Sequence, residues 1–173
     1  TSKPTRSDYH YLHAITTRWH DNDIYGHVNN VTYYSYFDSA VNSWLIAEGG
    51  LDIHDGDQVA FVVSSNCDYF APIAFPDAIE IGVKVARLGS SSVHYELAVF
   101  KQGRDEACAA GRFVHVFVDR ASNTAFPIPN RCRAAWRWPS ICRTKKSIGW
   151  LSSRAFHWFL TSLTDRGDGP KEP

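Results

Sequence analysis

Residues 18–30 have the sequence RWHDNDIYGHVNN and separate a short alternating segment from an amphipathic one. The stretch places acidic, histidine, glycine and asparagine residues within a single turn. Such a turn can bring a carboxylate beside the free backbone N–H groups at the start of a helix. A carboxylate that activates water and an N–H group that polarises a carbonyl can together form one site. Both the fold and the function are therefore expected to depend on this turn.

The segments on either side of the turn predict one strand and one long helix. Residues 10–19 alternate loosely and contain two threonines, as is typical of a strand. Over residues 31–47 the apolar residues recur at spacings of three and four, which predicts a helix with one apolar face. Asn29 or Asn30 is a suitable N-cap, and Gly49-Gly50 is a suitable end. The apolar face consists of Tyr34, Phe37, Val41, Trp44 and Leu45.

Four further strands are predicted after the helix, at residues 59–69, 79–85, 93–99 and 107–118. The last of them is apolar on both faces, which favours a central place in a sheet. The order of elements predicts an α+β fold, in which one helix covers one face of a five-stranded antiparallel sheet. A single helix covers only part of such a sheet, so pairing with a second copy is expected.

A longer pattern begins in the turn and reads DNDIYGHVNNVTY over residues 21–33, followed by YFD at 36–38. It resembles the opening motif of hotdog-fold acyl-CoA thioesterases, in particular the 4-hydroxybenzoyl-CoA thioesterase-like group. The segment RLGSSS at 87–92 also fits, although that second motif is weak alone. The resemblance covers about residues 8–130 and implies a hotdog fold, with a five-stranded antiparallel sheet wrapped around one long helix.

The resemblance also implies roles for individual residues. Asp23 matches the family's catalytic carboxylate, which either attacks the thioester carbon or activates a water for attack. The helix start near Asn30 would supply the N–H group that polarises the thioester carbonyl, and His27 would orient an asparagine or the substrate. Because coenzyme A is part of the substrate, no separate cofactor is implied. The residues that could meet the phosphates of coenzyme A are Lys84, Arg87 and Ser91, with Arg112 as a further candidate.

Each of these residues also has a purely structural interpretation. Aspartates commonly cap helices and close turns, and this is the role expected of Asp21. His27 suits a hydrogen-bonded scaffold equally well, and Asn29 and Asn30 suit cap and turn positions. The basic residues are single charges near strand ends, where side chains are usually solvated.

Other chemistries find less support in the sequence. A metal site could be formed by the acids and histidines of the turn, His20, Asp21, Asp23 and His27. The local string begins like a calcium loop, but Tyr25 and Thr32 occupy the fifth and twelfth positions, where that loop needs oxygen ligands of other types. No GxSxG elbow, GxxxxGK[ST] loop or GxGxxG loop occurs. We therefore expect no metal, and neither a common serine hydrolase nor a phosphate-loop enzyme.

The composition limits the partners and the cell compartment. The formal net charge of the 173 residues is zero, so no global field attracts nucleic acid. No apolar run approaches the roughly 18 residues of a membrane span. The four cysteines lack paired spacing and no secretory segment opens the chain, so a cytoplasmic protein with reduced thiols is expected. The chain contains no Met, so its start is expected to be trimmed or partial.

The balance of charge changes sign near residue 130. Residues 1–130 contain 9 Lys/Arg and 15 Asp/Glu, whereas residues 131–173 contain 9 and 3. The strand periodicity ends at the same point. We expect a hotdog thioesterase domain at 1–135 and a basic, Trp-rich C-terminal extension at 136–173. That extension is either loosely ordered or an amphipathic helix that binds a partner or a membrane surface.

Two functions of different classes agree with these patterns. One is an acyl-CoA thioesterase that hydrolyses its substrate to a free acid and CoA. The other is a non-catalytic acyl-CoA-binding hotdog module that acts as a sensor or assembly protein. In either case we expect a homodimer or homotetramer, with Asp23 of one chain near residues of another. The acyl group is not specified, because the aromatic residues at 33–37 could line a pocket or belong to the core.

Overall fold

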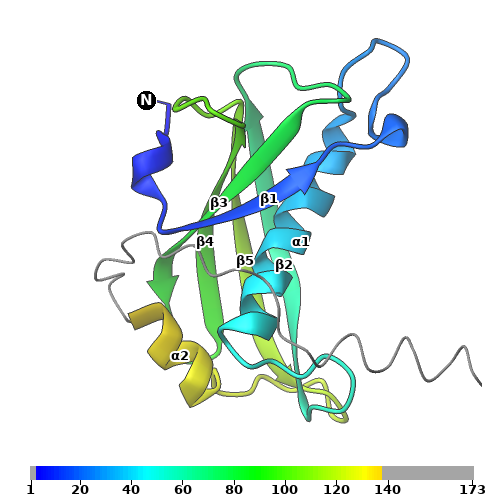
Figure 1. Cartoon of the computed structure of the whole chain (residues 1–173). Helices are drawn as coiled ribbons and strands as arrows, with labels where there is room; N and C mark the ends of the chain where they lie inside the picture. Colours follow the sequence, from blue (N-terminus) through cyan, green and yellow to red (C-terminus); the bar gives the residue numbers. More distant parts are fainter. Residues whose placement is uncertain (1–2, 138–173) are drawn as a thin grey trace, which may run out of the picture. The chain divides into compact units, whose positions relative to one another are not determined.

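The computed structural model describes residues 3–137, and the expectations for residues 138–173 lie outside the described part. The elements follow the predicted order along the chain (Figure 1). They are η1 (Arg6–Asp8), β1 (Tyr11–Thr16), η2 (Trp19–Asp21), α1 (Asn30–Ala47), β2 (Gln58–Tyr69), β3 (Ala78–Leu88), β4 (Ser92–Lys101), β5 (Ala109–Asp119) and α2 (Asn130–Arg137).

The strands form one antiparallel sheet in the order β1-β3-β4-β5-β2. α1 lies against one face of this sheet (Figure 1), which is the hotdog arrangement that the resemblance implied. β5 lies between β4 and β2, so the expectation that the last strand is in the interior of the sheet is confirmed, and β4 is the middle strand.

α1 packs on the sheet through one continuous face. Phe37 is fully buried, and its ring meets Phe113 of β5 edge-on with centroids 5.7 Å apart. Gly111 permits this approach, because a Cβ there would lie 2.6 Å from the Phe37 ring. Tyr34, expected on the packing face, is only partly buried at its margin and stacks on Phe113. The buried residues of the helix are Tyr33, Tyr36, Phe37, Ala40, Val41, Trp44 and Leu45.

The opposite face of the sheet is partly covered by the N-terminal segment. The ring of Tyr9 packs over Gly82, where a Cβ would lie only 2.5 Å from it, and meets Phe100 edge-on. Arg6 forms an ion pair with Glu80 of β3, and this contact lowers the pKa of the Glu80 carboxyl. A small second apolar cluster results on the side of the sheet away from α1.

α2 continues the folded chain past the predicted domain boundary at residues 135/136. Cys132 of this helix is fully buried. Trp136 stacks on Trp44 of α1 with centroids 4.8 Å apart and meets Tyr95 of β4 edge-on at 5.7 Å. The helix therefore contributes an aromatic side chain to the core from just beyond that boundary. Within residues 3–137, neither α1 nor α2 has the length and apolar character needed to cross a bilayer.

Candidate active site

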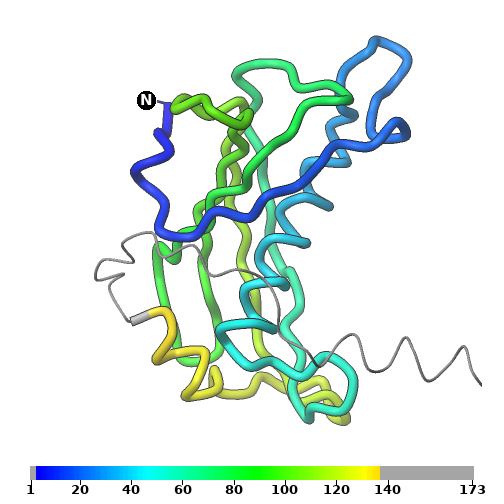
Figure 2. The backbone as a smooth tube through the Cα atoms, viewed as in Figure 1, coloured from blue at the N-terminus to red at the C-terminus, as the bar shows by residue number. Residues whose placement is uncertain are grey.

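The turn between β1 and α1 is closed by its own backbone hydrogen bonds, and the backbone trace in Figure 2 shows it as a narrow loop at one end of the sheet. The Asp23 N–H donates to the carbonyl of His27 at 2.8 Å, and the Gly26 N–H donates to the carbonyl of Asp23 at 3.1 Å. Gly26 has a φ of 82°, a left-handed conformation that favours glycine. These bonds fix the backbone position of Asp23.

The carboxylate of Asp23 accepts a hydrogen bond through only one of its two oxygens. Its Oδ1 accepts a hydrogen bond from the Tyr25 N–H at 2.9 Å. No other donor to this carboxylate is present among residues 3–137, and the side chain is half-buried. One oxygen thus orients the group, while the other remains available to a water or a substrate.

The start of α1, seven residues after Asp23 in the chain, offers a backbone donor. Asn29 is the N-cap, and its side chain accepts a hydrogen bond from the Val31 N–H at 3.2 Å. The Asn30 N–H has no acceptor within the described part of the chain. Tyr69, at the end of β2, donates to the Asn30 carbonyl at 3.2 Å and ties the sheet to this helix start. A free N–H at the positive end of a helix suits a developing negative charge.

Asp21 is buried and holds the turn to the helix. Its Oδ2 accepts from the Arg18 N–H at 2.7 Å and from the Tyr36 hydroxyl at 2.6 Å. Its backbone carbonyl accepts from the Asn29 N–H at 2.8 Å. The residue therefore joins the exit of β1, the N-cap and the second turn of α1, in agreement with its expected structural role. Burial and the Asp21 carboxylate raise the pKa of Tyr36, so its hydroxyl stays protonated as a donor.

Sequence reasoning treated Tyr36 only as a pocket or core aromatic and gave no role to Tyr69. A signal was available for Tyr36, because a buried tyrosine usually finds a partner for its hydroxyl. Nothing local indicated that the partner would be Asp21, fifteen residues earlier.

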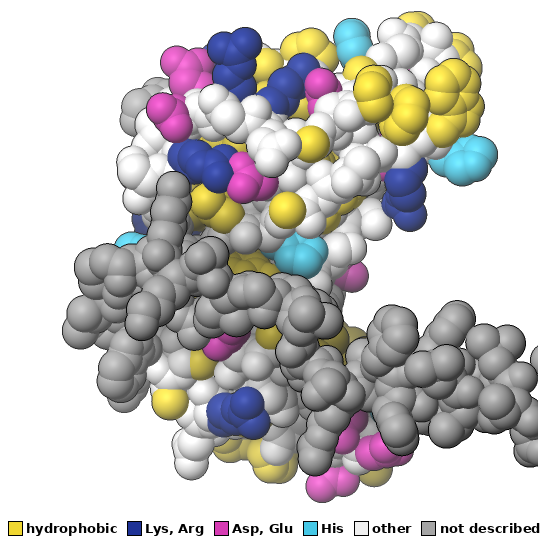
Figure 3. Space-filling view, viewed as in Figure 1, with side chains coloured by type: hydrophobic (Ala, Val, Ile, Leu, Met, Phe, Trp, Pro, Cys, Tyr) yellow, Lys and Arg dark blue, Asp and Glu magenta, His cyan; other side chains and the backbone are white. Residues whose placement is uncertain are grey.

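Large apolar side chains surround the turn on the protein surface. Trp19 is 74% exposed, Ile24 93%, Tyr25 81% and Val31 70%. The space-filling view shows apolar atoms gathered over this end of the molecule (Figure 3). Isolated exposed apolar residues are ordinary, but a group of them beside a polar site is typical of a surface that another molecule covers.

The predicted residues fall into two groups within one chain. Asp23, His27 and Asn30 lie together in the turn and the first residue of α1, and His27 is exposed. Lys84 and Arg87 lie on β3, and Ser91 precedes β4. β3 begins beside the end of β1, where Ala78 pairs with Thr16. Since a strand rises about 3.3 Å per residue, Arg87 is roughly 30 Å along the sheet from that point.

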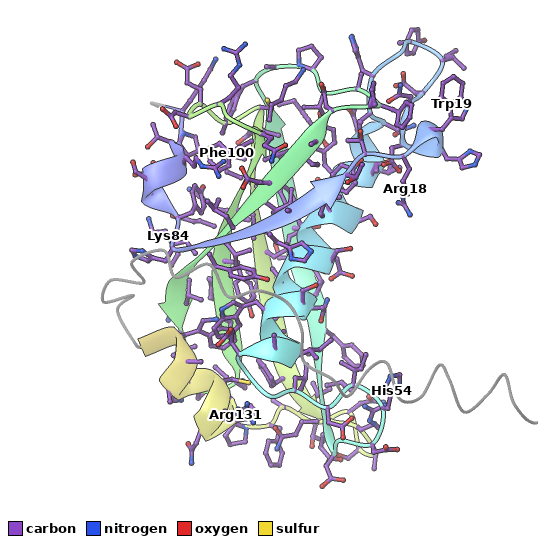
Figure 4. All side chains as sticks on the ribbon, viewed as in Figure 1. Arg18, Trp19, His54, Lys84, Phe100 and Arg131 are labelled. Atoms are coloured by element: carbon purple, nitrogen blue, oxygen red, sulfur yellow. The ribbon has the colours of Figure 1, made fainter. Side chains whose placement is uncertain are left out.

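Figure 4 agrees with this separation, since the labelled Lys84 is far from Arg18 and Trp19 of the turn. Within residues 3–137 the acids and histidines of the turn do not converge as a metal-binding group. One chain by itself therefore does not bring the expected phosphate contacts to the turn.

The β2 edge of the sheet is unprotected. β2 runs for 12 residues, and Asp68 is its first charged residue. Phe61 is 50% exposed, Val62 42% and Val63 60%. Natural sheets usually guard a long edge strand with charges or proline, because the free N–H and C=O groups can pair with another strand.

Comparisons with known proteins agree with this architecture. Residues 17–136 match the profile of a family described as the thioesterase-like superfamily. The solved PA5185 protein of Pseudomonas aeruginosa strain PAO1 is 62% identical with a TM-score of 0.77, over 78% of this chain and 94% of that one. The PA2801 protein of Pseudomonas aeruginosa, named a candidate thioesterase, is 30% identical with a TM-score of 0.66, over 72% and 95%. BH1999, a gentisyl-coenzyme A thioesterase, is 26% identical with a TM-score of 0.65, over 73% and 99%.

Proposed function

The chain belongs to the thioesterase-like superfamily, and we propose that it hydrolyses an acyl-CoA thioester to a free acid and CoA. The observation that carries this proposal is the geometry of the turn. Asp23 keeps one carboxylate oxygen without a partner in residues 3–137, and the nearby helix start keeps the Asn30 N–H without an acceptor. A general base or nucleophile and a polarising donor are the two groups that thioester hydrolysis requires.

In the proposed reaction the thioester carbonyl accepts a hydrogen bond from the Asn30 N–H. Negative charge that develops on this oxygen is stabilised by the positive end of α1. A donor of this kind contributes typically about 3 kcal/mol to the transition state. Asp23 then either removes a proton from the attacking water and passes it to the departing thiolate of CoA, or attacks the carbonyl carbon itself. In the second case the thiolate leaves, takes a proton from water, and a further water hydrolyses the acyl–aspartate anhydride to the free acid. His27, at the end of the same turn, orients the substrate.

We further propose that a second copy of the chain completes the site. Pairing of two β2 edges would cover Phe61, Val62 and Val63, and it would bring residues of one chain toward the turn of the other. Lys84, Arg87 and Ser91 would then meet the CoA phosphates of a substrate whose acyl group lies at the partner's turn. Lys84 and Arg87 lie about 20 and 30 Å along β3 from Ala78, the residue that pairs with the end of β1. This separation within one chain supports an arrangement across two chains.

The test is release of free thiol from a panel of acyl-CoA substrates by the wild-type protein and by Asp23→Asn. The panel should include aryl thioesters, since one similar structure is a gentisyl-coenzyme A thioesterase. Asp23→Asn preserves the side-chain shape and removes the charge, so we expect turnover to fall by at least about 100-fold. The unfolding midpoint and the affinity for acyl-CoA should change little.

Asp55→Asn is the matched control, because Asp55 is exposed in the loop at the other end of α1. It should retain wild-type turnover. Near-normal turnover in Asp23→Asn would exclude Asp23 as base or nucleophile. A wild-type protein that binds acyl-CoA and releases no thiol from any substrate would instead indicate the non-catalytic acyl-CoA-binding module.

A further inference from the structure

Tyr69 is the last residue of β2, and its side chain reaches the first turn of α1. The Tyr69 hydroxyl donates a hydrogen bond to the Asn30 carbonyl at 3.2 Å, although the two residues are 39 positions apart in the chain. No other hydrogen bond within residues 3–137 joins the first turn of α1 to a strand of the sheet. The position of this helix start relative to the sheet therefore depends on Tyr69.

The surroundings of Tyr69 fix its ring and keep its hydroxyl protonated. The ring meets that of Tyr33 edge-on with centroids 4.9 Å apart, and Tyr33 is buried in the face of α1 that packs on the sheet. The backbone of Tyr69 pairs with Ala109 of β5, an interior strand. Burial and the neighbouring Cys67 thiol raise the pKa of Tyr69, so the hydroxyl remains a donor. Tyr69 is thus a fixed point from which the helix start can be held.

The turn before α1 holds the same helix start from the opposite direction along the chain. The Asn29 N–H donates to the carbonyl of the buried Asp21 at 2.8 Å, and the Asn29 side chain accepts from the Val31 N–H at 3.2 Å. The Asn30 N–H belongs to the peptide group that joins Asn29 to Asn30. This peptide group is therefore fixed by the turn through Asn29 and by β2 through the Asn30 carbonyl.

The Tyr69 hydrogen bond matters more for the position of the helix start than for the stability of the fold. Tyr69 is 42% exposed, so water can replace the bond and its net contribution to folding is small. The first turn of a helix, however, lacks intrahelical partners for its N–H groups and opens more readily than the helix interior. A group that acts on a transition state must be held within about 0.5 Å of its productive position. A bond that restrains the first turn therefore has its main effect on the Asn30 donor.

We propose that Tyr69 is a positioning residue for thioester hydrolysis, because its hydroxyl holds the helix start so that the Asn30 N–H points at the thioester oxygen. The inference rests on the function proposed above and adds a residue from the sheet to a site that otherwise consists of the turn and the helix start. Tyr69 does not touch the reacting atoms and acts through the Asn30 backbone. Its loss should therefore weaken the stabilisation of the developing negative charge and leave the binding of the substrate in its ground state unchanged.

The test compares the full-length wild-type protein with Tyr69→Phe, which keeps the ring against Tyr33 and removes only the hydroxyl. We expect kcat for thiol release to fall about three- to tenfold, as the loss of one hydrogen bond predicts, with KM within about twofold of the wild-type value. The unfolding midpoint should change little. Tyr9→Phe is the matched control, because Tyr9 packs on the face of the sheet away from α1 and its hydroxyl forms no hydrogen bond within residues 3–137. That variant should retain the wild-type kcat.

Calorimetric binding of two CoA analogues distinguishes positioning from a general structural loss. A trifluoromethyl ketone in place of the thioester forms a tetrahedral adduct that resembles the transition state, whereas an alkyl thioether of CoA has no carbonyl oxygen. Tyr69→Phe should weaken binding of the ketone by about the same factor as kcat and leave binding of the thioether unchanged.

Equal weakening of both analogues, a wild-type kcat in Tyr69→Phe, or an equal loss of kcat in Tyr9→Phe would overturn the role of Tyr69. These results differ from a failure of the proposed function. A wild-type protein that releases no thiol from any substrate refutes the hydrolysis and this inference together, whereas a wild-type protein that is active and a Tyr69→Phe variant that is equally active refute this inference alone.

Discussion

Asp21 and Asp23 are separated by a single residue and have different surroundings. Asp21 is 3% exposed, and its oxygens are occupied by the Arg18 and Tyr36 donors. Asp23 accepts one hydrogen bond and keeps an oxygen toward the surface. A carboxylate that is saturated with donors is a poor base, whereas one that is oriented but not saturated can accept a proton or attack a carbonyl. The two aspartates are therefore expected to affect different measured quantities.

We predict that Asp21→Asn lowers stability more than it lowers turnover. The amide loses the charge that the Tyr36 hydroxyl and the Arg18 side chain bind, and hydrogen bonds to charged groups contribute about 1.5–3 kcal/mol each. Urea unfolding should therefore show a loss of about 2 kcal/mol, and Tyr36→Phe should show a smaller loss of the same kind. A turnover loss in Asp21→Asn as large as that in Asp23→Asn, with stability unchanged, would contradict this division of roles.

At the scale of elements, β2 is an edge strand of the sheet, and its outer edge has no partner strand within residues 3–137. Its sequence carries apolar residues on both faces around Val63, where the pairing with β5 is interrupted by an irregularity between Val62 and Ser64. We expect this stretch to form the contact with a second copy. Edge strands of natural proteins commonly avoid such contacts by carrying a lysine. A lysine substituted into β2 should prevent the contact in the same way.

We predict that Val63→Lys converts the assembly to monomers, because it places a positive charge at the proposed contact. Light scattering at micromolar protein concentration should report the mass of a dimer or larger for the wild type and of a monomer for the variant. Ile53→Lys, which adds the same charge to a 44% exposed apolar position outside the strands, should retain the wild-type mass. A wild-type protein that is monomeric under these conditions would refute the proposed pairing.

At the scale of the whole molecule, the core of the fold contains two polar groups that lack hydrogen-bond partners in the described chain. They are the imidazole of His115 and the hydroxyl of Tyr95, whose rings lie 5.2 Å apart. Burial lowers the pKa of His115 to about 4. The unfolded chain, where His has a pKa near 6.5, therefore binds more protons than the folded chain between pH 6.5 and 4.

We predict from this difference that folding stability falls as the pH decreases through that window. Linkage of the two pKa values gives a loss of about 2 kcal/mol at pH 5 relative to pH 7.5. His115→Phe should abolish that part of the loss, as measured by urea unfolding at the two pH values. His54→Gln, at an exposed position, should not. An unchanged pH dependence in His115→Phe would mean that another group is responsible.

We also predict that the folded domain ends after α2 and not at Ala135. A chain truncated after Arg137 should keep the fold and the activity, whereas truncation after Ala135 removes the Trp136 ring that stacks on Trp44. Loss of a partly buried tryptophan from the core should cost roughly 1–3 kcal/mol of unfolding free energy. Thermal unfolding of the two truncated chains measures this difference. Equal stability of both would show that Trp136 contributes little, and loss of folding in both would show that residues after 137 are required.

Local patterns in the sequence were sufficient to predict the elements and the turn. The three- and four-residue spacing after Asn30 and the Gly49-Gly50 stop report hydrogen bonds between residues close in the chain. The alternation in four later segments reports the extended conformation of each strand. Both depend on local conformation and side-chain type, so a single sequence reveals them. The match of the turn to a known motif likewise required only thirteen consecutive residues.

The tertiary structure alone decided which residues meet across the sheet. The pairing of Asp21 with Tyr36, the docking of Trp136 on Trp44 and the central place of β4 all depend on how elements far apart in the chain pack together. Periodicity shows that a side chain faces one side of its strand, but it does not show which strand lies alongside or how far that strand is shifted. Those choices follow from how the whole set of apolar faces packs into a single core.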